Sequence, residues 1–407
     1  MHDPRMKKRI VVTGLGVVSS IGIGHEEFWK NLLAGKSGVS NIECFDSSKH
    51  RTHNGGEIKS FDPEKYVGFR RSRLMGRTSQ MALVAAKLAV EDADLNIKNS
   101  DKTRIGVSLG AATGEAQVIE GIDKVWVTQG EDKVDTKLIR QYSFDNIPSN
   151  IANAFRLQGP VRIFTTACAA GNYAIGYGYD MLQTGRADKM MVGGSDDFSY
   201  VSFTGFNQLG AVAPEKCQPF DKNRKGMMVG EGAGIMILEL LEDALKRKAK
   251  IYAEILGYGL SCDAYHMTNP RSEGLAQCIL NAMSEADISI ENVDYICAHG
   301  TGTKLNDAAE SAALHKVFGE KIKEIPVSSI KSMLAHTMGA ASAIEAIACC
   351  LTVKNNIIPP TINYETADPG CDIDCVPNEA REKKVNIVLN NAFAFGANNS
   401  CLVIKKF

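Results

Sequence analysis

Short apolar runs of strand type alternate with helical stretches along almost the whole chain. The first series predicts strands at residues 10–13, 105–109, 161–164 and 189–192 and helices at 81–92 and 169–181. After a helix at 242–248, a second series predicts strands at 251–258, 295–298, 385–389 and 401–404 and helices at 275–286 and 307–318. A repeated strand–helix order indicates a parallel or mixed sheet covered by helices. The fold class predicted is therefore α/β.

The division of the chain is gradual rather than abrupt. No Pro/Ser-rich linker separates independent domains, although the pattern restarts near residue 250. We predict two halves that share one core, covering residues 6–250 and 251–407. A cysteine of interest, Cys168, lies in the first half, and two histidines of interest, His299 and His336, lie in the second.

Composition excludes several classes of protein. The 407 residues are 44% hydrophobic and 23% charged, which is typical of a globular protein and excludes disorder or a fibre. A net charge of −1 indicates no nucleic-acid or anionic-membrane partner, so an acidic partner must meet a local basic patch. Eleven cysteines without a CxxC pair favour a reducing cytoplasm. We find no signal peptide and no apolar run of ~20 residues, so no membrane insertion is expected.

Cys168 lies between a predicted strand and a predicted helix, in the sequence TTACAAG (residues 165–171). A cysteine at a helix N-terminus faces unpaired backbone N–H groups, which lower the thiol pKa and favour the thiolate. A free cysteine is more often a small buried hydrophobic residue. Cys168 alone therefore does not establish a nucleophile.

Two of the eight histidines lie in glycine-flanked motifs. His299 follows an apolar strand in AHGTGT (298–303), and His336 precedes an Ala-rich helix in KSMLAHTMGA (331–340). Both lie at strand ends or in the loops that follow, where ligands bind in open α/β sheets. Two neutral imidazoles can donate N–H groups to one carbonyl oxygen and stabilise an enolate. A cysteine with two histidines is therefore suited to decarboxylative carbanion formation.

The chain resembles the β-ketoacyl-acyl carrier protein synthases of the thiolase superfamily. It is most similar to the elongating synthase II class, with a leaning to type II polyketide ketosynthases. Besides the histidine motifs, the resemblance is carried by VVTGLG (11–16), TAC (166–168), PFD (219–221), GEGA (230–233), DAYHMT (263–268) and PPTIN (359–363). It implies a thiolase-like fold, with two pseudo-symmetric halves in an αβαβα layering.

The resemblance also implies a reaction. Cys168 would receive an acyl chain from an acyl carrier protein, and His299 and His336 would bind the malonyl thioester carbonyl and assist decarboxylation. The resulting carbanion would attack the Cys168 thioester, a Claisen condensation that makes a 3-oxoacyl-carrier protein for fatty acid elongation. The backbone N–H groups of Cys168 and Phe395 would form the oxyanion hole.

Further residues receive roles from the same resemblance. Lys331 would be held by Glu310 and, more distantly, by Glu345, and would organise the site around His336. Phe395 would be a gate that moves as the acyl chain enters. The threonines expected to contact substrate are Thr301 and Thr303 along the pantetheine arm, Thr113 in the acyl pocket, and Thr268.

No resident cofactor or metal is implied, because the 4′-phosphopantetheine arrives on the carrier protein. The partners implied are acyl- and malonyl-loaded carrier proteins and a second subunit. That subunit is either another copy of this chain or a chain-length-factor homologue. Whether the product is a fatty acid or a polyketide stays open.

Several features limit or compete with this interpretation. Ala335, Ser342, Ala394 and Ala397 stand where the family usually has glycine, so the gating loop is expected to be stiffer. Residues 13–19 could suggest a dinucleotide site, but a third glycine and the acidic partner are missing. A degradative thiolase would need a second reactive cysteine. A chain-length factor or a decarboxylase-only paralogue would lack Cys168.

Overall fold

One large mixed sheet contains strands from both halves of the chain. The computed structural model describes residues 7–59 and 61–407, so residue 6, the predicted start of the first half, lies outside the described residues. The strand order is β11-β10-β14-β15-β9-β1-β8-β7-β5-β6, with β2 paired to β1. The strands are β1 (Ile10–Ser19), β2 (Gly22–Ile23), β5 (Ile105–Gly110), β6 (Val161–Phe164), β7 (Lys189–Asp196), β8 (Gly232–Leu240), β9 (Ala253–Cys262), β10 (Tyr295–Cys297), β11 (Val327–Ser328), β14 (Ile387–Phe393) and β15 (Asn398–Lys405).

The sheet is built from the same five-stranded pattern used twice. If the main strands of each half are numbered along the chain, both halves follow the order 3-2-4-5-1. In each half the second strand is parallel to the third and fourth, and the fifth is antiparallel to its two neighbours. The repeat passes from one half to the other between α10 (Leu241–Lys246) and β9. The α/β class and the two pseudo-symmetric halves are confirmed.

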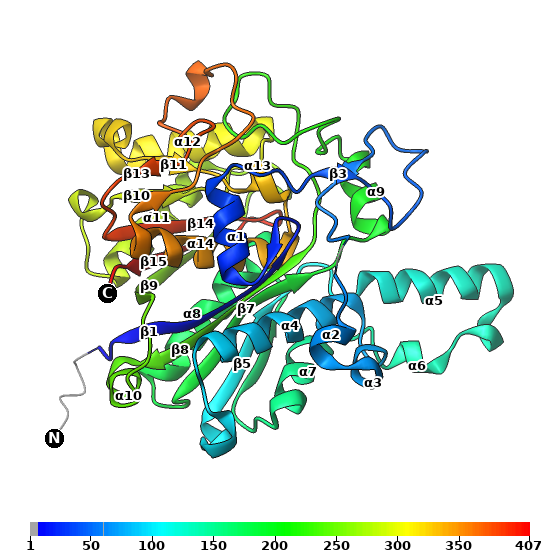
Figure 1. Ribbon diagram of the computed structural model, residues 1–407. Helices are drawn as coiled ribbons and strands as arrows, with labels where there is room; N and C mark the ends of the chain where they lie inside the picture. The colour runs from blue at the N-terminus through cyan, green and yellow to red at the C-terminus, as the bar shows by residue number, and fades with distance from the viewer. Residues whose placement is uncertain (1–6, 60) are drawn as a thin grey trace.

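Helices lie on both faces of each half-sheet (Figure 1). Helices α4 (Arg77–Asp92) and α7 (Asn146–Phe155) cover the outer face of the first half, and α11 (Ser272–Glu285) and α12 (Lys304–Phe318) cover that of the second. Helices α8 (Ala170–Gln183) and α14 (Ala341–Asn355) lie between the half-sheets and pack on each other. Separate apolar clusters fill the central layer and the two outer layers. This is the predicted αβαβα layering.

Smaller elements complete the chain around this core. The remaining helices are α1 (His25–Leu33), α2 (Glu64–Val67), α3 (Phe69–Ser72), α5 (Ala116–Gln129), α6 (Thr136–Ile139), α9 (Tyr200–Gln208) and α13 (Lys331–Leu334). The remaining strands form two small hairpins, β3 (Ser40–Asn41) with β4 (Asn54–Gly55) and β12 (Ile357–Ile358) with β13 (Arg381–Glu382).

The predicted strands 385–389 and 401–404 leave residues 390–399 between them as a loop, and this expectation was wrong. Most of this segment is strand, with only residues 394–397 between β14 and β15. Inside the sheet the amide nitrogen of Asn390 donates to Asn172 Oδ1 at 3.0 Å and to the Ser342 carbonyl at 2.9 Å, which offsets part of the cost of burying this polar side chain. A buried polar side chain costs little when it is hydrogen-bonded, so composition misidentified the segment.

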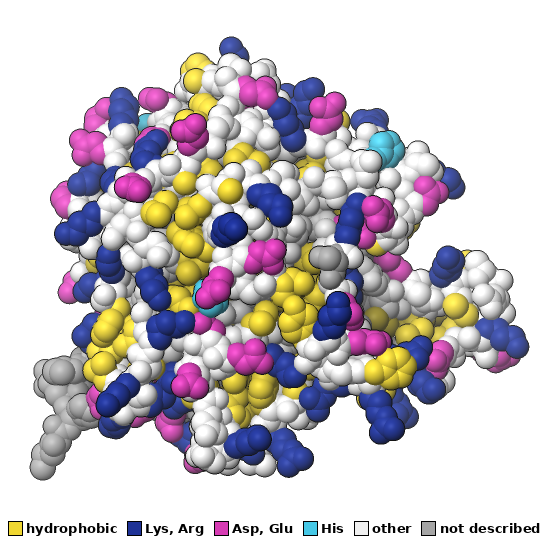
Figure 2. Space-filling model, in the orientation of Figure 1, with side chains coloured by type: hydrophobic (Ala, Val, Ile, Leu, Met, Phe, Trp, Pro, Cys, Tyr) yellow, Lys and Arg dark blue, Asp and Glu magenta, His cyan; other side chains and the backbone are white. Residues whose placement is uncertain are grey.

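An arm that contains α5 and α6 projects from the body of the molecule (Figure 1). It carries large apolar side chains on its surface, with Trp126 55% and Val127 84% exposed. In the space-filling view hydrophobic and basic side chains lie side by side on this projection (Figure 2). Exposed apolar groups of this size are typical of surfaces that bind another molecule. None of the helices in the described part of the chain is long and apolar enough to cross a membrane.

Close backbone contact fixes the start of α8 against the end of β5. A Cβ atom added at Gly110 would lie 2.5 Å from the backbone nitrogen of Gly171 and would overlap the carbonyl carbon of Ala170. The strand therefore approaches the first turn of the helix without an intervening side chain. The turn that carries Cys168 lies directly before this contact.

We expect Gly110→Ala to lower the free energy of unfolding by about 1–3 kcal/mol, because overpacked core positions force the backbone to move. Chemical denaturation measures the effect. Gly121→Ala is the matched control, because a Cβ atom at Gly121 in α5 meets nothing within 4 Å. That variant should keep or slightly raise stability. Equal losses in the two variants would contradict the close contact at β5.

Candidate active site

Cys168 lies in a tight turn between β6 and α8. The turn residues Ala167–Ala169 form one turn of 3-10 helix, and Ala167 adopts a positive φ of 48°. Cys168 is 8% exposed. The predicted position at the N-terminus of a helix is confirmed.

His336 lies in the equivalent turn of the second half, before α14. Its backbone is held on both sides, because its N–H donates to Met228 O at 2.7 Å and its carbonyl accepts from Gly230 N at 3.0 Å. The imidazole Nδ1 accepts from the Met338 backbone N–H at 3.1 Å. A neutral ring with Nδ1 as acceptor carries its proton on Nε2. Since Nε2 lies 3.0 Å from Cys168 Sγ, it is the donor to the sulfur.

His299 follows β10 and completes the cluster. Its ring centroid lies 5.5 Å from that of His336 and 6.2 Å from that of Phe393, with edge-to-face geometry in both cases. The Glu310 carboxylate accepts the backbone N–H of His299 at 2.9 Å and that of Gly300 at 2.8 Å. Glu310 thus holds the backbone of the histidine loop.

Lys331 is paired differently from the expectation. Its ammonium donates to the Glu345 carboxylate, and both side chains are 2% exposed. Glu310 was predicted as the nearer partner, but its two oxygens are taken by the His299 loop. Burial alone would lower the pKa of Lys331, but the charge of Glu345 and its hydrogen bond outweigh burial and raise the pKa. Lys331 therefore stays charged.

Burial sets the protonation states of the cluster. It lowers the pKa of His336 well below 6.5, with help from the Lys331 charge, and it lowers the pKa of His299 for the same reasons. Burial also raises the pKa of Cys168 to about 11, against the Lys331 charge and hydrogen bonds from the backbone N–H groups of Phe395 and Cys168 itself. The predicted lowering of the Cys168 pKa is wrong, because desolvation outweighs the donors at the helix terminus.

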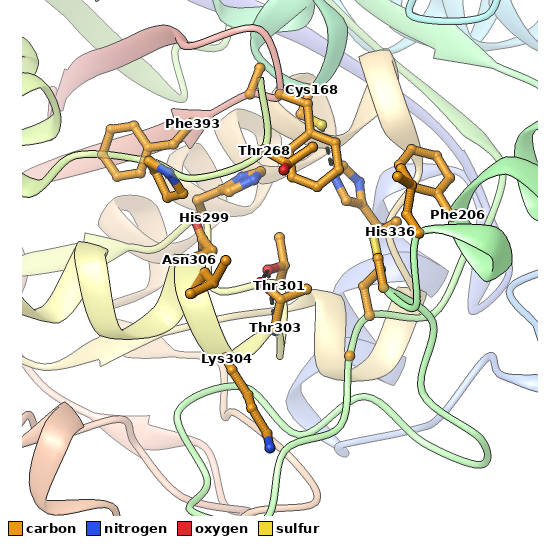
Figure 3. Close-up of a pocket in the computed structure, with 18 of the residues that line it drawn as sticks. Cys168, Phe206, Thr268, His299, Thr301, Thr303, Lys304, Asn306, His336 and Phe393 are labelled. Atoms are coloured by element: carbon orange, nitrogen blue, oxygen red, sulfur yellow. Dashed lines mark hydrogen bonds between the residues drawn. The ribbon is translucent and has the colours of Figure 1, made fainter. Parts of the chain in front are cut away.

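A cavity of about 460 Å³ opens onto Cys168 and both histidines. Thr301 and Thr303 lie on its wall, with their hydroxyl oxygens 2.9 Å apart. Thr268 and Phe395 also line the cavity. In Figure 3 Cys168 lies at one end, the two threonines lie further along, and Lys304 lies at the opposite end. All but one of the predicted substrate contacts are therefore assembled around one space.

Thr113 is the exception, because it does not line this cavity. Its hydroxyl donates to Asp196 Oδ1 at 3.0 Å. Asp196 also accepts the backbone N–H groups of Ala112 at 2.6 Å and Gly339 at 2.6 Å, and so joins the turns after β5 and before α14. Asp196 was not predicted. The signal that could have found it is the acidic pair at the end of the strand, in the sequence MMVGGSDD (190–197).

Two of the three alanines that stand in place of glycine keep a glycine-like backbone. Ala335 has φ 65° and Ala397 has φ 66°, both in the left-handed region that costs about 1–2 kcal/mol for a residue with Cβ. The Cβ atom of Ala335 fits against Gly56 and Gly230, where an added Cβ would lie only 2.8 and 3.0 Å from it. These neighbours make room for the extra methyl group beside His336.

The cluster also has the composition of a metal site. Ligand atoms of Cys168, His299 and His336 lie within 4.8 Å of one another. Thiolate and imidazole are the ligands that zinc prefers. Binding would require loss of the Cys168 proton, which the raised pKa opposes.

Comparison with known proteins identifies the family. Residues 7–244 match the model of the beta-ketoacyl synthase N-terminal domain, and residues 252–365 match that of the C-terminal domain. The chain belongs to the beta-ketoacyl synthase family. It is similar to the 3-oxoacyl-[acyl-carrier-protein] synthase 2 of Coxiella burnetii, at 40% identity over 98% of this chain and 99% of the relative.

Solved structures of the family share the whole fold. The ishigamide ketosynthase/chain length factor has a TM-score of 0.96 and 42% identity, covering 99% of this chain and 100% of that one. A type II PKS acyl-carrier protein in complex with its ketosynthase, AntDE:AntF, has a TM-score of 0.91 and 35% identity, covering 99% and 100%. The thiolase-like fold is thereby confirmed.

We expect alkylation of Cys168 by iodoacetamide to accelerate about tenfold per pH unit between about pH 7 and pH 9 without reaching a plateau, since only the thiolate reacts. Peptide mass spectrometry measures the rate at Cys168. The paired variant Lys331→Met/Glu345→Gln should react more slowly at each pH, because the charge that lowers the Cys168 pKa is gone. A plateau below pH 8 in the unmodified protein would contradict the raised pKa.

Proposed function

We propose that this chain is a 3-oxoacyl-acyl carrier protein synthase that catalyses decarboxylative condensation of a Cys168-bound acyl chain with malonyl-carrier protein. The observation that carries the proposal is the 3.0 Å contact between Cys168 Sγ and the proton-bearing Nε2 of His336, at one end of a cavity that His299 also lines. Membership of the beta-ketoacyl synthase family supports it.

In the first half-reaction the Cys168 sulfur attacks the thioester carbonyl of the acyl-carrier protein. A new C–S bond forms to Cys168, and the pantetheine thiol leaves with the proton that Cys168 gives up. The backbone N–H groups of Phe395 and Cys168 favour the Cys168 thiolate, which supports a role for both as the oxyanion hole of the tetrahedral intermediate. Phe395 also lines the cavity, which supports its role as a gate.

In the second half-reaction the malonyl carboxylate leaves as CO₂, and its bonding electrons form an enolate. His299 and His336 each donate a ring N–H to the enolate oxygen. The low pKa values of the two histidines keep both rings neutral, and a neutral imidazole retains the one N–H that this role needs. The enolate carbon then attacks the Cys168 thioester, and the sulfur leaves and regains a proton.

The positioning residues act on this cluster rather than on the substrate. Glu310 fixes the backbone of His299, and Lys331 lowers the pKa values of both histidines. No resident cofactor is needed, because the pantetheine arm arrives with each substrate. The eleven unpaired cysteines support a reducing cytoplasm as the site of action.

Polyketide synthesis is a second candidate, with the same chemistry on a different chain. A ketosynthase/chain length factor among the relatives favours it. The exposed apolar arm fits either a second copy of this chain or a chain-length-factor homologue. The two candidates therefore differ in partner.

We expect Cys168→Ala to lower condensation by at least about a thousandfold, because the covalent intermediate cannot form. Mass spectrometry of the carrier-bound product measures condensation, and the product length separates elongation from polyketide synthesis. Cys262→Ala is the control, because Cys262 is exposed and does not line the cavity. Condensation that persists in Cys168→Ala would rule out the proposed mechanism.

The arm makes a second prediction. We propose that the arm lies in a dimer interface, so Val127→Asp should shift the protein from dimer to monomer, because a buried unpaired charge opposes association. Light scattering measures the mass. Leu245→Asp in α10 replaces another exposed apolar residue, 55% exposed, and should leave the mass unchanged. A purified chain that is monomeric and dimerises only with a Cys-lacking homologue supports the polyketide candidate. A dimer unaffected by Val127→Asp contradicts the role of the arm.

A further inference from the structure

Two lysines lie on the wall of the catalytic cavity. Lys225 and Lys304 both line the space that Cys168 lines, and both are exposed. Neither forms an ion pair with another of the described residues. Among the described residues that line the cavity there is no carboxylate. An opening with two unpaired cationic groups and no acidic one favours an anionic ligand.

The two lysines come from segments that are bound to each other. Arg224 donates from Nε to the Thr303 carbonyl and from Nη2 to the Lys304 carbonyl, at 3.2 Å each. The Gly226 backbone N–H donates to the Gly302 carbonyl at 3.0 Å. Arg224 is itself 5% exposed and is paired with Asp368. The backbones that carry Lys225 and Lys304 are therefore held side by side before any ligand binds.

The order of groups along the cavity matches one kind of ligand. Cys168 and the histidines lie at one end, the Thr301 and Thr303 hydroxyls follow, and Lys304 lies at the far end (Figure 3). A phosphopantetheine thioester presents its groups in the same order, with the thioester first, then two amides, then the phosphate. Hydroxyls suit amides, and ammonium groups suit a phosphate.

We propose that Lys225 and Lys304 form a phosphate subsite that binds the phosphate of the phosphopantetheine arm. This inference rests on the proposed function and adds the recognition of the far end of the arm. Asp307 does not neutralise the pair, because it is fully buried, accepts the backbone N–H of Phe220 and faces Arg224.

The test compares Cys168 acylation by acyl-phosphopantetheine and by acyl-pantetheine, which lacks the phosphate. The unmodified enzyme should prefer the phosphorylated substrate in kcat/KM by about tenfold, as expected for two exposed charge pairs. Lys225→Gln/Lys304→Gln should lose this preference and keep the rate with acyl-pantetheine. Lys222→Gln removes a neighbouring exposed lysine that does not line the cavity and should keep the preference.

Equal rates with both thioesters in the unmodified enzyme, or a preference that survives the double substitution, would overturn the subsite. Acyl-coenzyme A and acyl-carrier protein both carry the phosphate, but only the second carries a protein surface. An equal fall in kcat/KM with both substrates in the double variant supports a phosphate contact. A fall confined to the carrier protein shows contact with its protein surface and overturns the proposal.

Failure of the proposed function would look different, because no thioester would acylate Cys168. In that case the binding of phosphopantetheine, measured without any reaction, tests the subsite. Phosphopantetheine should raise the melting temperature of the unmodified enzyme and of Lys222→Gln, but not that of the double variant. No difference between these proteins would overturn the subsite.

Discussion

The close packing of α8 on α14 is the contact on which the rest of the site depends. A Cβ atom at Gly171 would lie 2.7 Å from Ala343 N, so the helices approach backbone to backbone. The Ser342 hydroxyl accepts the Asn172 N–H at 3.0 Å and ties the two first turns together. Because the helices are equivalent elements of the two halves, their preceding turns meet. Those turns carry Cys168 and His336.

Burial at this junction then determines the chemistry. A thiol and two imidazoles without solvent remain neutral, since each charged form is poorly solvated. The charge of Lys331 acts on all three groups, and Glu345 stabilises that charge. The electrostatic field of Lys331 opposes protonation of the histidines and favours the thiolate only in part. The resting cluster is therefore a neutral hydrogen-bonded pair, and the proposed reaction begins from the thiol rather than the thiolate.

Sequence patterns predicted those parts of the site that are local. The turns of Cys168, His299 and His336 follow from strand ends and glycines, and the repeated strand–helix order predicted the class of fold. The partner of Lys331 was not predictable, because Glu310 and Glu345 lie on separate helices and only packing decides which carboxylate reaches the ammonium. The helix terminus near Cys168 was identified, but the cost of burial was not visible in sequence. Lys225 and Lys304 lie 79 residues apart in the chain, and only the backbone bonds between their segments bring them together.

The neutral Cys168–His336 pair is tested most directly by nitrogen-15 NMR of histidine-labelled protein. The account predicts that His336 is the neutral Nε2–H tautomer between about pH 6 and pH 8, with Nδ1 unprotonated, because Met338 N–H occupies Nδ1. Cys168→Ala should shift the Nε2 signal without changing the tautomer. An imidazolium signal, or a proton on Nδ1, would contradict the account.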